Sequence, residues 1–169
     1  MTPQSRQRLT TLAGLALLIS AATILTAWGF ELIGGYVPCP LCLQQRVPYY
    51  IGVPLTVVAL WLAYTARITG ARIVMALFAA TMAYGLYLGV YQAGAEWGFW
   101  QGPTDCAPGD TSVRDAANFL QTLQTTRIAS CTDPALRILG LSFAGWNAVV
   151  TLVLTLLGLV AALGRSNRT

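Results

Sequence analysis

Four cysteines are the residues of this sequence best suited to chemistry, and two of them form the motif Cys39-Pro40-Leu41-Cys42. A C-x-x-C pair can close a small, reducible disulfide, and a nearby cation or helix N-terminus lowers the pKa of such thiols. Arg46 follows Cys42 by four residues, so on a helix the two side chains would share a face. Pro48 favours a helix start just after the motif, with the positive end of that helix near Cys42. Either geometry favours a Cys42 thiolate.

Arg46 has a second interpretation, because arginines at helix ends commonly reach into the lipid headgroup layer without a further role. Its position beside a C-x-x-C motif at a membrane edge favours the chemical role. At that depth a lipid-soluble redox partner could contact a thiolate and an arginine together.

The other two cysteines, Cys106 and Cys131, are separated by 24 residues. Gly102-Pro103 and Pro108-Gly109 flank Cys106, and such clusters favour an exposed turn. The two cysteines are either a second reactive pair or a structural disulfide, which would contribute about 3.5 kcal/mol of stability. We expect no metal site, since the chain has no histidine and its cysteines lack the paired spacing typical of zinc sites.

The composition is that of a membrane protein. Hydrophobic side chains make up 56% of the 169 residues and charged ones only 9%, against about 25% in soluble domains. Four stretches carry no charge, and each is close to or above the roughly 20 residues that a membrane-spanning helix needs; they are residues 9–30, 47–66, 73–95 and 138–164. The first is longer than a signal-peptide core, so we expect it to be retained. We predict an all-α membrane protein, a four-helix transmembrane bundle forming a single membrane domain over residues 1–169.

The arginines predict the orientation, since cytoplasmic segments beside membrane helices are enriched in positive residues. The two tails and the turn after the second stretch hold six arginines and no acid, while all six acids lie on the opposite side. We therefore expect both termini to be cytoplasmic. The loops over residues 31–46 and 96–137, with all four cysteines, would face a compartment where disulfides persist. This distribution accounts for the net charge of +4 and argues against nucleic-acid binding.

The second loop contains a predicted short helix. Residues 112–128 place apolar side chains on about half of a helical wheel, with Ser112 and Asp115 as a weak capping box. We expect a short interfacial helix on the membrane surface, with a soluble cap over the spans as the alternative.

Aromatic residues, glycines and one proline suggest how the spans are seated. Tryptophans and tyrosines near the ends of the stretches are expected to act as interfacial anchors; they are Trp28, Tyr36, Tyr49, Tyr50, Trp61, Tyr64, Trp97, Trp100 and Trp146. Gly85, Gly89 and Gly158 are available for close helix contacts. Pro54 is expected to kink the second stretch and make room for a ring beside Cys42.

Four features follow one another along the chain: PCPLCLQQRVPYY at residues 38–50, GAEWGFWQGPTDC at residues 94–106, the cysteine at position 131, and LRILGLSFAGWN at residues 136–147. Together they resemble the DsbB family of disulfide bond formation proteins. The resemblance covers nearly the whole chain. Its first motif, followed by two cysteines and set among four spans, is highly specific.

The resemblance implies a bacterial inner-membrane oxidoreductase that reoxidises a DsbA-like thioredoxin-fold protein of the periplasm and passes two electrons to ubiquinone or menaquinone. It implies that Cys39 and Cys42 are the pair next to the quinone and that Arg46 supports the quinone. Cys106 and Cys131 would face the partner. Cys106 would form the mixed disulfide with the partner, and Cys131 would exchange with Cys39.

One position departs from the family, and two alternatives remain open. Gln92 stands where relatives often have a histidine, which puts a proton-donating role at this position in doubt. Vitamin K epoxide reductase-like enzymes perform similar chemistry on four helices, and a membrane scaffold could carry four cysteines as structural disulfides. The four stretches contain no charged residue, which argues against an ion pump or a proton-coupled transporter.

Overall fold

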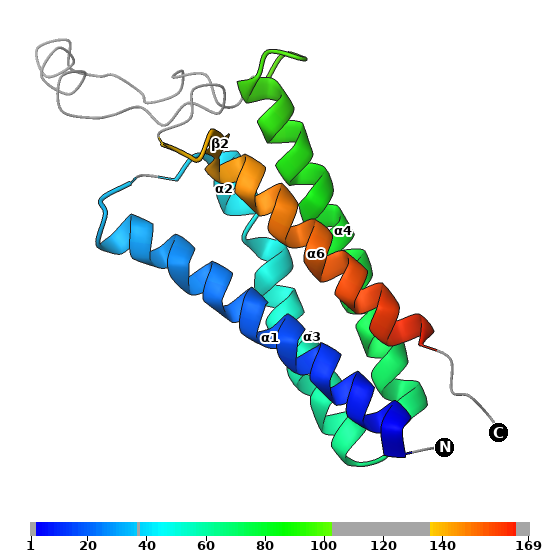
Figure 1. Cartoon of the computed structure of the whole chain (residues 1–169). Coiled ribbons are helices and arrows are strands. Elements are labelled where there is room, and N and C mark those ends of the chain that lie inside the picture. The colour runs from blue at the N-terminus through cyan, green and yellow to red at the C-terminus, as the bar shows by residue number, and fades with distance from the viewer. Residues whose placement is uncertain (1–2, 37, 103–135, 165–169) are drawn as a thin grey trace, which may run out of the picture.

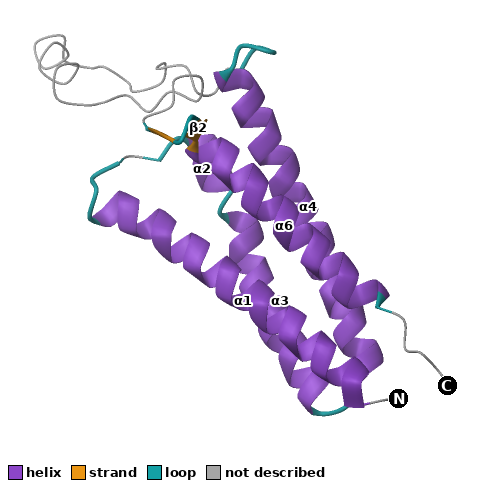
Figure 2. Cartoon of the chain, in the orientation of Figure 1, coloured by secondary structure: helices purple, strands orange, loops and turns teal. Residues whose placement is uncertain are grey.

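The computed structural model describes residues 3–36, 38–102 and 136–164 of the chain. The helices and strands in these ranges (Figure 2) are α1 (Pro3–Leu32), α2 (Pro40–Gln44), α3 (Val47–Tyr64), α4 (Ile68–Glu96), β1 (Arg137–Ile138), β2 (Leu141–Ser142) and α6 (Phe143–Leu163). The helix predicted over residues 112–128 lies outside the described residues.

Four helical stretches are long and apolar enough to cross a membrane, namely α1, α2 with α3, α4, and α6. This confirms the predicted all-α fold with four spanning helices. The starts of all four spans differ from the prediction. Helix α1 begins at Pro3, the second span begins with α2 at Pro40, and α4 begins at Ile68, so these three start earlier than predicted, whereas α6 begins only at Phe143.

A tight hairpin explains the late start of α6, which was predicted to begin at Ile138. Strands β1 and β2 are antiparallel, with Arg137 opposite Ser142. The turn residues Leu139 and Gly140 have φ angles of 53° and 84°, and a type I′ hairpin turn requires positive φ at both positions. The Ser142 hydroxyl then accepts a hydrogen bond from the Gly145 N–H and caps α6, as serine does at many helix N-termini.

The helices form one bundle, in which α4 packs against α3 and α6, and α1 packs against the same two helices. Figure 1 shows both termini at one end of the bundle and α2 with the hairpin at the other. We call the first the termini end; it holds the start of α1 and α4 and the end of α3 and α6. The cysteine end holds α2, the end of α1 and α4 and the start of α3 and α6.

The three glycines predicted for close helix contacts, Gly85, Gly89 and Gly158, each lie against a neighbouring helix. A Cβ atom added at Gly89 would meet the backbone nitrogen of Ala148 at 3.0 Å, and one at Gly158 would meet the Cβ of Ala79 at 2.9 Å. These glycines let α4 and α6 approach closely. Close van der Waals packing of this kind is a main source of helix association in lipid.

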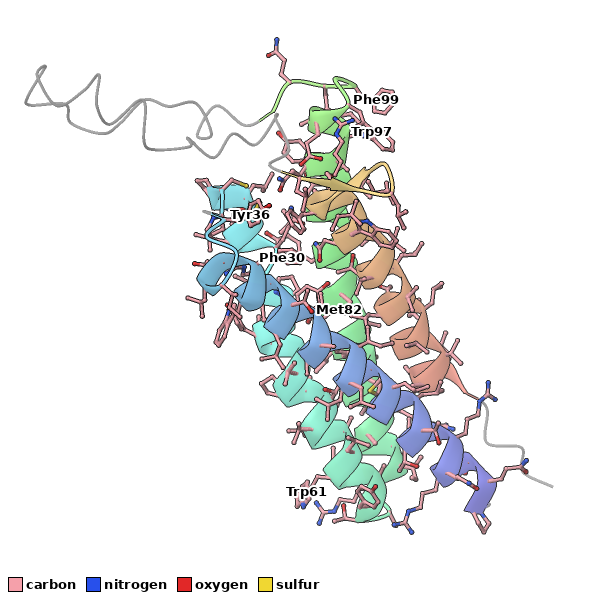
Figure 3. All side chains as sticks on the ribbon, turned by 60° about the vertical axis from the view of Figure 1, so that its left-hand side comes forward. Phe30, Tyr36, Trp61, Met82, Trp97 and Phe99 are labelled. Carbon is pink, nitrogen blue, oxygen red and sulfur yellow. The ribbon has the colours of Figure 1, made fainter. Side chains whose placement is uncertain are left out.

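Larger side chains fill the centre of the bundle, and aromatic rings lie near its ends. Met75, Phe78, Met82 and Leu154 are fully buried. Figure 3 shows Met82 midway along the bundle, Trp97 and Phe99 at the end of α4, and Trp61 near the termini end. At the cysteine end, the rings of Phe30 and Phe143 are 5.0 Å apart and join the end of α1 to the start of α6.

Candidate redox site at the cysteine end

The C-x-x-C motif forms the first turn of α2. Cys39 is the N-cap residue, with an extended backbone, and Pro40 occupies the first turn, where its missing N–H costs no hydrogen bond. The Cys39 sulfur accepts a hydrogen bond from the Cys42 N–H at 3.1 Å. The local sequence therefore brings both sulfurs to one helix start, a turn before α3 begins at Val47.

Both residues are free thiols in the structure. Cys39 is buried, with 3% of its surface exposed, and packs with Leu41 against Leu88 of α4, while Cys42 is half-buried at the edge of this cluster. Helix α4 is thus the wall of the thiol site.

The two thiols are chemically unequal. A side-chain hydrogen bond with Cys42 and, next, burial raise the pKa of the Cys39 thiol. The Cys42 N–H acts in the opposite direction, since it favours an anion on the Cys39 sulfur, but it is outweighed. Cys39 is therefore the thiol of the reduced pair that loses its proton less readily.

Gln92 of α4 is the polar side chain that contacts both sulfurs. Its Nε2 lies 3.5 Å from the Cys42 sulfur and 3.7 Å from the Cys39 sulfur. The Cys42 sulfur is also 3.8 Å from Gln92 Oε1. A side-chain amide has both donor and acceptor atoms, so Gln92 can accept from a thiol or donate to a thiolate.

A chain of uncharged polar side chains continues from Gln92 into the bundle. Gln45, from the turn between α2 and α3, donates its amide to Gln92 Oε1. Asn147 of α6 donates to Gln45 Oε1 at 2.6 Å, and the Tyr49 hydroxyl donates to Asn147 Oδ1 at 2.7 Å. We call Tyr49, Asn147, Gln45 and Gln92 the amide chain. It joins α3, α4 and α6 to the thiols.

Tyr49 was predicted to anchor the chain at the membrane interface, and this prediction is wrong. Only 2% of its surface is exposed, and its hydroxyl bonds to Asn147 instead of to water or headgroups. A buried tyrosine needs a partner for its hydroxyl. Its neighbour Tyr50 is exposed, and its role as an interfacial anchor stays a prediction.

Glu96 lies at the last turn of α4, one turn beyond Gln92. Its Oε1 accepts from Gln92 Nε2 at 3.3 Å. Its Oε2 is buried and has no hydrogen-bond partner among the described residues. A carboxyl group with one buried oxygen therefore stands behind the amide that contacts both sulfurs.

Arg46 is the N-cap residue of α3, and its guanidinium forms an ion pair with Glu31 of α1. The arginine side chain is 13% exposed and the glutamate 34%. Within the described residues, its side-chain hydrogen bond goes to Glu31 and not to a sulfur. The pair joins α1 to the start of α3 beside the thiol site.

A cavity of about 280 Å³ lies between α1 and α3. Its walls are mostly apolar and are formed by Ile24, Leu25, Trp28, Tyr49, Tyr50, Val53 and Pro54. Trp28 donates to the Tyr50 hydroxyl at 3.0 Å, one helical turn from the Glu31–Arg46 pair. A kink at Pro54 was predicted to make room for a ring beside Cys42, but neither cysteine lines this cavity. Tyr49 lines it and also begins the amide chain.

Cys106 and Cys131 lie outside the described residues, as do the turns that flank Cys106. The structure therefore brings together three of the predicted site residues, Cys39, Cys42 and Arg46, at the cysteine end.

Comparison with known proteins agrees with this arrangement. The family described as "Disulfide bond formation protein DsbB" matches residues 8–161. The chain belongs to the DsbB family. A protein of Marinobacter nauticus named "Disulfide bond formation protein B" is 30% identical over 158 residues, which cover 90% of each chain. "Uncharacterized protein RP370" of Rickettsia prowazekii is 30% identical over 156 residues, covering 89% of this chain and 86% of the relative. No solved structure matches the chain.

DsbB membership establishes a multi-pass membrane protein of disulfide bond formation, and in general terms a disulfide-forming oxidoreductase. It selects the DsbB family over the vitamin K epoxide reductase-like alternative. The reducible pair at the end of an apolar bundle is the arrangement that such an activity needs.

Sequence reasoning missed most of the polar residues around the thiols. Gln92 was noted only as a departure from the family, while Gln45, Asn147 and Glu31 were not singled out. The signal was present, because Gln92 and Asn147 are amides inside stretches that are otherwise almost entirely apolar. A search of the spans for charged residues alone does not find them.

Proposed function

We propose that this DsbB-family protein oxidises the dithiol of a DsbA-like thioredoxin-fold partner and passes two electrons to ubiquinone or menaquinone. The observation that carries the proposal is the position of the Cys39–Cys42 pair. A reducible dithiol at the end of a membrane bundle can exchange with a water-soluble protein on one side and meet a lipid-soluble carrier on the other.

The proposed setting is a bacterial inner membrane, with both termini in the cytoplasm and all four cysteines in the periplasm. The arginines support this orientation: Arg6, Arg8, Arg67 and Arg72 all belong to the segments of the termini end. Cytoplasmic segments are the ones enriched in such residues.

The proposed exchange balances as follows. The partner dithiol attacks a Cys106–Cys131 disulfide through a mixed disulfide at Cys106, and the partner leaves oxidised. The Cys106–Cys131 dithiol then reduces a Cys39–Cys42 disulfide in the same way, by thiolate attack on sulfur. The reduced Cys39–Cys42 pair finally loses two electrons and two protons as its S–S bond forms again, and a quinone takes up both as a hydroquinone.

The residues present fit a quinone. A lipid-soluble isoprenoid tail needs an apolar space, and the cavity between α1 and α3 supplies one. Neither cysteine lines it, but Tyr49 in its wall is joined to the thiols through the amide chain. Its volume is close to the lower end of the range of about 300–1,000 Å³ for small-molecule sites. Cys42 and Arg46 would hold the quinone ring, and the apolar cavity walls would receive the tail. A bound quinone supplies a two-electron acceptor.

The test is quinone reduction by the purified full-length protein with a reduced DsbA-like partner. We expect one quinone reduced per partner disulfide formed, followed as loss of quinone absorbance. Cys106→Ala should prevent the mixed disulfide with the partner, and Cys42→Ser should abolish quinone reduction. Partner oxidation that proceeds without loss of quinone, or partner trapping that is equally efficient on Cys106→Ala, would contradict the proposal.

A further inference from the structure

The amide chain is an unusual feature for the interior of a membrane bundle. Tyr49, Gln45 and Gln92 are each at most 6% exposed. Burying an amide without a partner costs several kcal/mol in an apolar environment, so such groups are retained where each one is satisfied. Interhelical hydrogen bonds help to hold helices together in lipid, and this chain in addition ends at the two sulfurs.

The chain has a direction. Each hydrogen bond is donated toward the thiols. Tyr49 donates to Asn147, Asn147 donates to Gln45, and Gln45 donates to Gln92. The Gln92 Nε2 group lies within hydrogen-bond distance of both sulfurs. It has two N–H bonds, and Glu96 Oε1 accepts one, so the two sulfurs share the other. Because Gln45 donates to Gln92 Oε1, the nitrogen of Gln92 is turned toward the sulfurs: it lies 3.5 Å from the Cys42 sulfur, against 3.8 Å for Oε1. The positive ends of the N–H dipoles therefore point at the site where a thiolate forms.

Glu96 fixes the same direction from the other side. An ionised carboxylate only accepts hydrogen bonds, and its Oε1 takes one from Gln92 Nε2. Rotating the Gln92 amide by half a turn would place its oxygen against this carboxylate oxygen and its nitrogen against the Gln45 donor. Both ends of the amide are thus held in the orientation that donates to sulfur.

We propose that the amide chain stabilises the Cys42 thiolate. Gln92 is the catalytic contact, since it touches the reacting sulfurs, whereas Gln45, Asn147 and Tyr49 are positioning residues that act through it. The inference rests on the proposed function in one respect, that Cys42 is the sulfur which reduces the quinone. It adds a source of anion stabilisation that carries no net charge.

The charged groups around the thiols show why an uncharged donor matters. On α1 and at the start of α3, Glu31 and Arg46 pair with each other. On α4, Glu96 opposes negative charge on Cys42. The positive charge of Arg137 in β1 favours the ionised form of Glu96. Hydrogen bonds from a fixed donor favour a thiolate. They do not require the positive charge of Arg46, which is already paired with Glu31.

The first test is an ultraviolet titration of thiolate formation by the Cys39–Cys42 pair, in full-length protein that also carries Cys106→Ser and Cys131→Ser. Gln92→Leu should move the midpoint of thiolate formation upward by about one to two pH units, because a charge-assisted hydrogen bond is lost. Gln92→Glu keeps the size of the side chain but replaces the donor with a second carboxylate, so it should raise the midpoint at least as far. An unchanged midpoint in both variants would overturn the role of Gln92.

The second test addresses the far end of the chain with a variant that should fold. Tyr49→Phe removes one hydroxyl and keeps the buried ring. It should raise the midpoint by a few tenths of a pH unit, because hydrogen bonds in a chain strengthen one another by about 10–30% per bond. Tyr84→Phe on the exposed face of α4 is the matched control and should not shift it. Equal midpoints for Tyr49→Phe and Tyr84→Phe would overturn the positioning role.

These titrations need neither quinone nor partner, so the two proposals fail separately. Shifted midpoints in a protein that reduces no quinone would support the amide chain and reject the proposed function. Normal quinone reduction with unshifted midpoints would reject the amide chain alone.

Discussion

The two ends of the bundle use polar side chains in different ways. At the termini end, arginine side chains complete helix C-termini. Arg6 donates to the carbonyl oxygens of Ala63 and Tyr64 at 3.0 and 2.7 Å, and Arg72 donates to that of Gly164. These carbonyls lie in the last turn of α3 and at the C-cap of α6. Carbonyls at a helix C-terminus have no hydrogen-bond partner within their own helix.

At the cysteine end, polar side chains bond mainly to one another and to sulfur. The helix starts there are capped by neutral atoms: the Cys39 sulfur for α2 and the Ser142 hydroxyl for α6. The one described arginine at the start of α3 pairs with a carboxylate instead of a carbonyl. Polar groups thus stabilise helix C-termini at the termini end and surround a reactive pair at the cysteine end.

The largest difference between the two ends should appear when one arginine is removed from each. Arg46→Ala at the cysteine end should raise the quinone KM about tenfold, which corresponds to about 1.4 kcal/mol of binding free energy, the order of one charge-assisted hydrogen bond. Glu31 would also lose its ion-pair partner. Steady-state quinone reduction with a reduced DsbA-like partner measures the change.

Arg67→Ala is the matched control, because Arg67 precedes α4 at the termini end. Its quinone KM should equal that of the unchanged protein. A quinone KM and rate that stay constant in Arg46→Ala would remove this arginine from the quinone site and leave it the role of joining α1 to α3.

The sequence predicts the fold and the reactive pair because both depend on local patterns. Uncharged stretches of about 20 residues define the spans, and Cys39 and Cys42 are adjacent on a helix start whatever surrounds them. Close contacts at Gly85, Gly89 and Gly158 follow from small residues in spans and are confirmed.

The surroundings of the pair depend on contacts between distant parts of the chain, which periodicity does not specify. Tyr49 meets Asn147, 98 positions away, and Gln45 meets Gln92, 47 positions away. These pairings form only once α3, α4 and α6 pack together. The same holds for Arg46, whose partner Glu31 lies on another helix. The four-residue spacing between Cys42 and Arg46 does not predict this ion pair.

The second prediction concerns pH, to which the cysteine end should respond through Cys39. The pKa of this thiol is raised in the folded reduced protein, so the unfolded chain releases the proton first as pH rises. The contribution to stability is full below about pH 8.5, the ordinary cysteine pKa. Above that pH it should fall by up to about 1.4 kcal/mol per pH unit.

Thermal unfolding of the reduced protein in detergent, from roughly pH 7 to pH 10, measures this loss. Cys39→Ala should show a shallower decline over the same range, because the group that binds the extra proton is gone. Equal slopes for the two proteins would contradict the assignment and leave other groups, such as the buried Tyr49, as the source of any decline.

The smallest expected effect lies at the termini end. Arg6→Ala removes two hydrogen bonds to the last turn of α3, but the side chain is largely exposed, so the cost should be about 0.5–1 kcal/mol of unfolding free energy. Arg8→Ala is the control, since this exposed neighbour makes no such bond within the described ranges. Thermal unfolding separates the two, and the thiolate midpoint should be the same in both. A shifted midpoint in Arg6→Ala would show that the two ends are coupled, because no capping bond of α3 reaches the thiols directly.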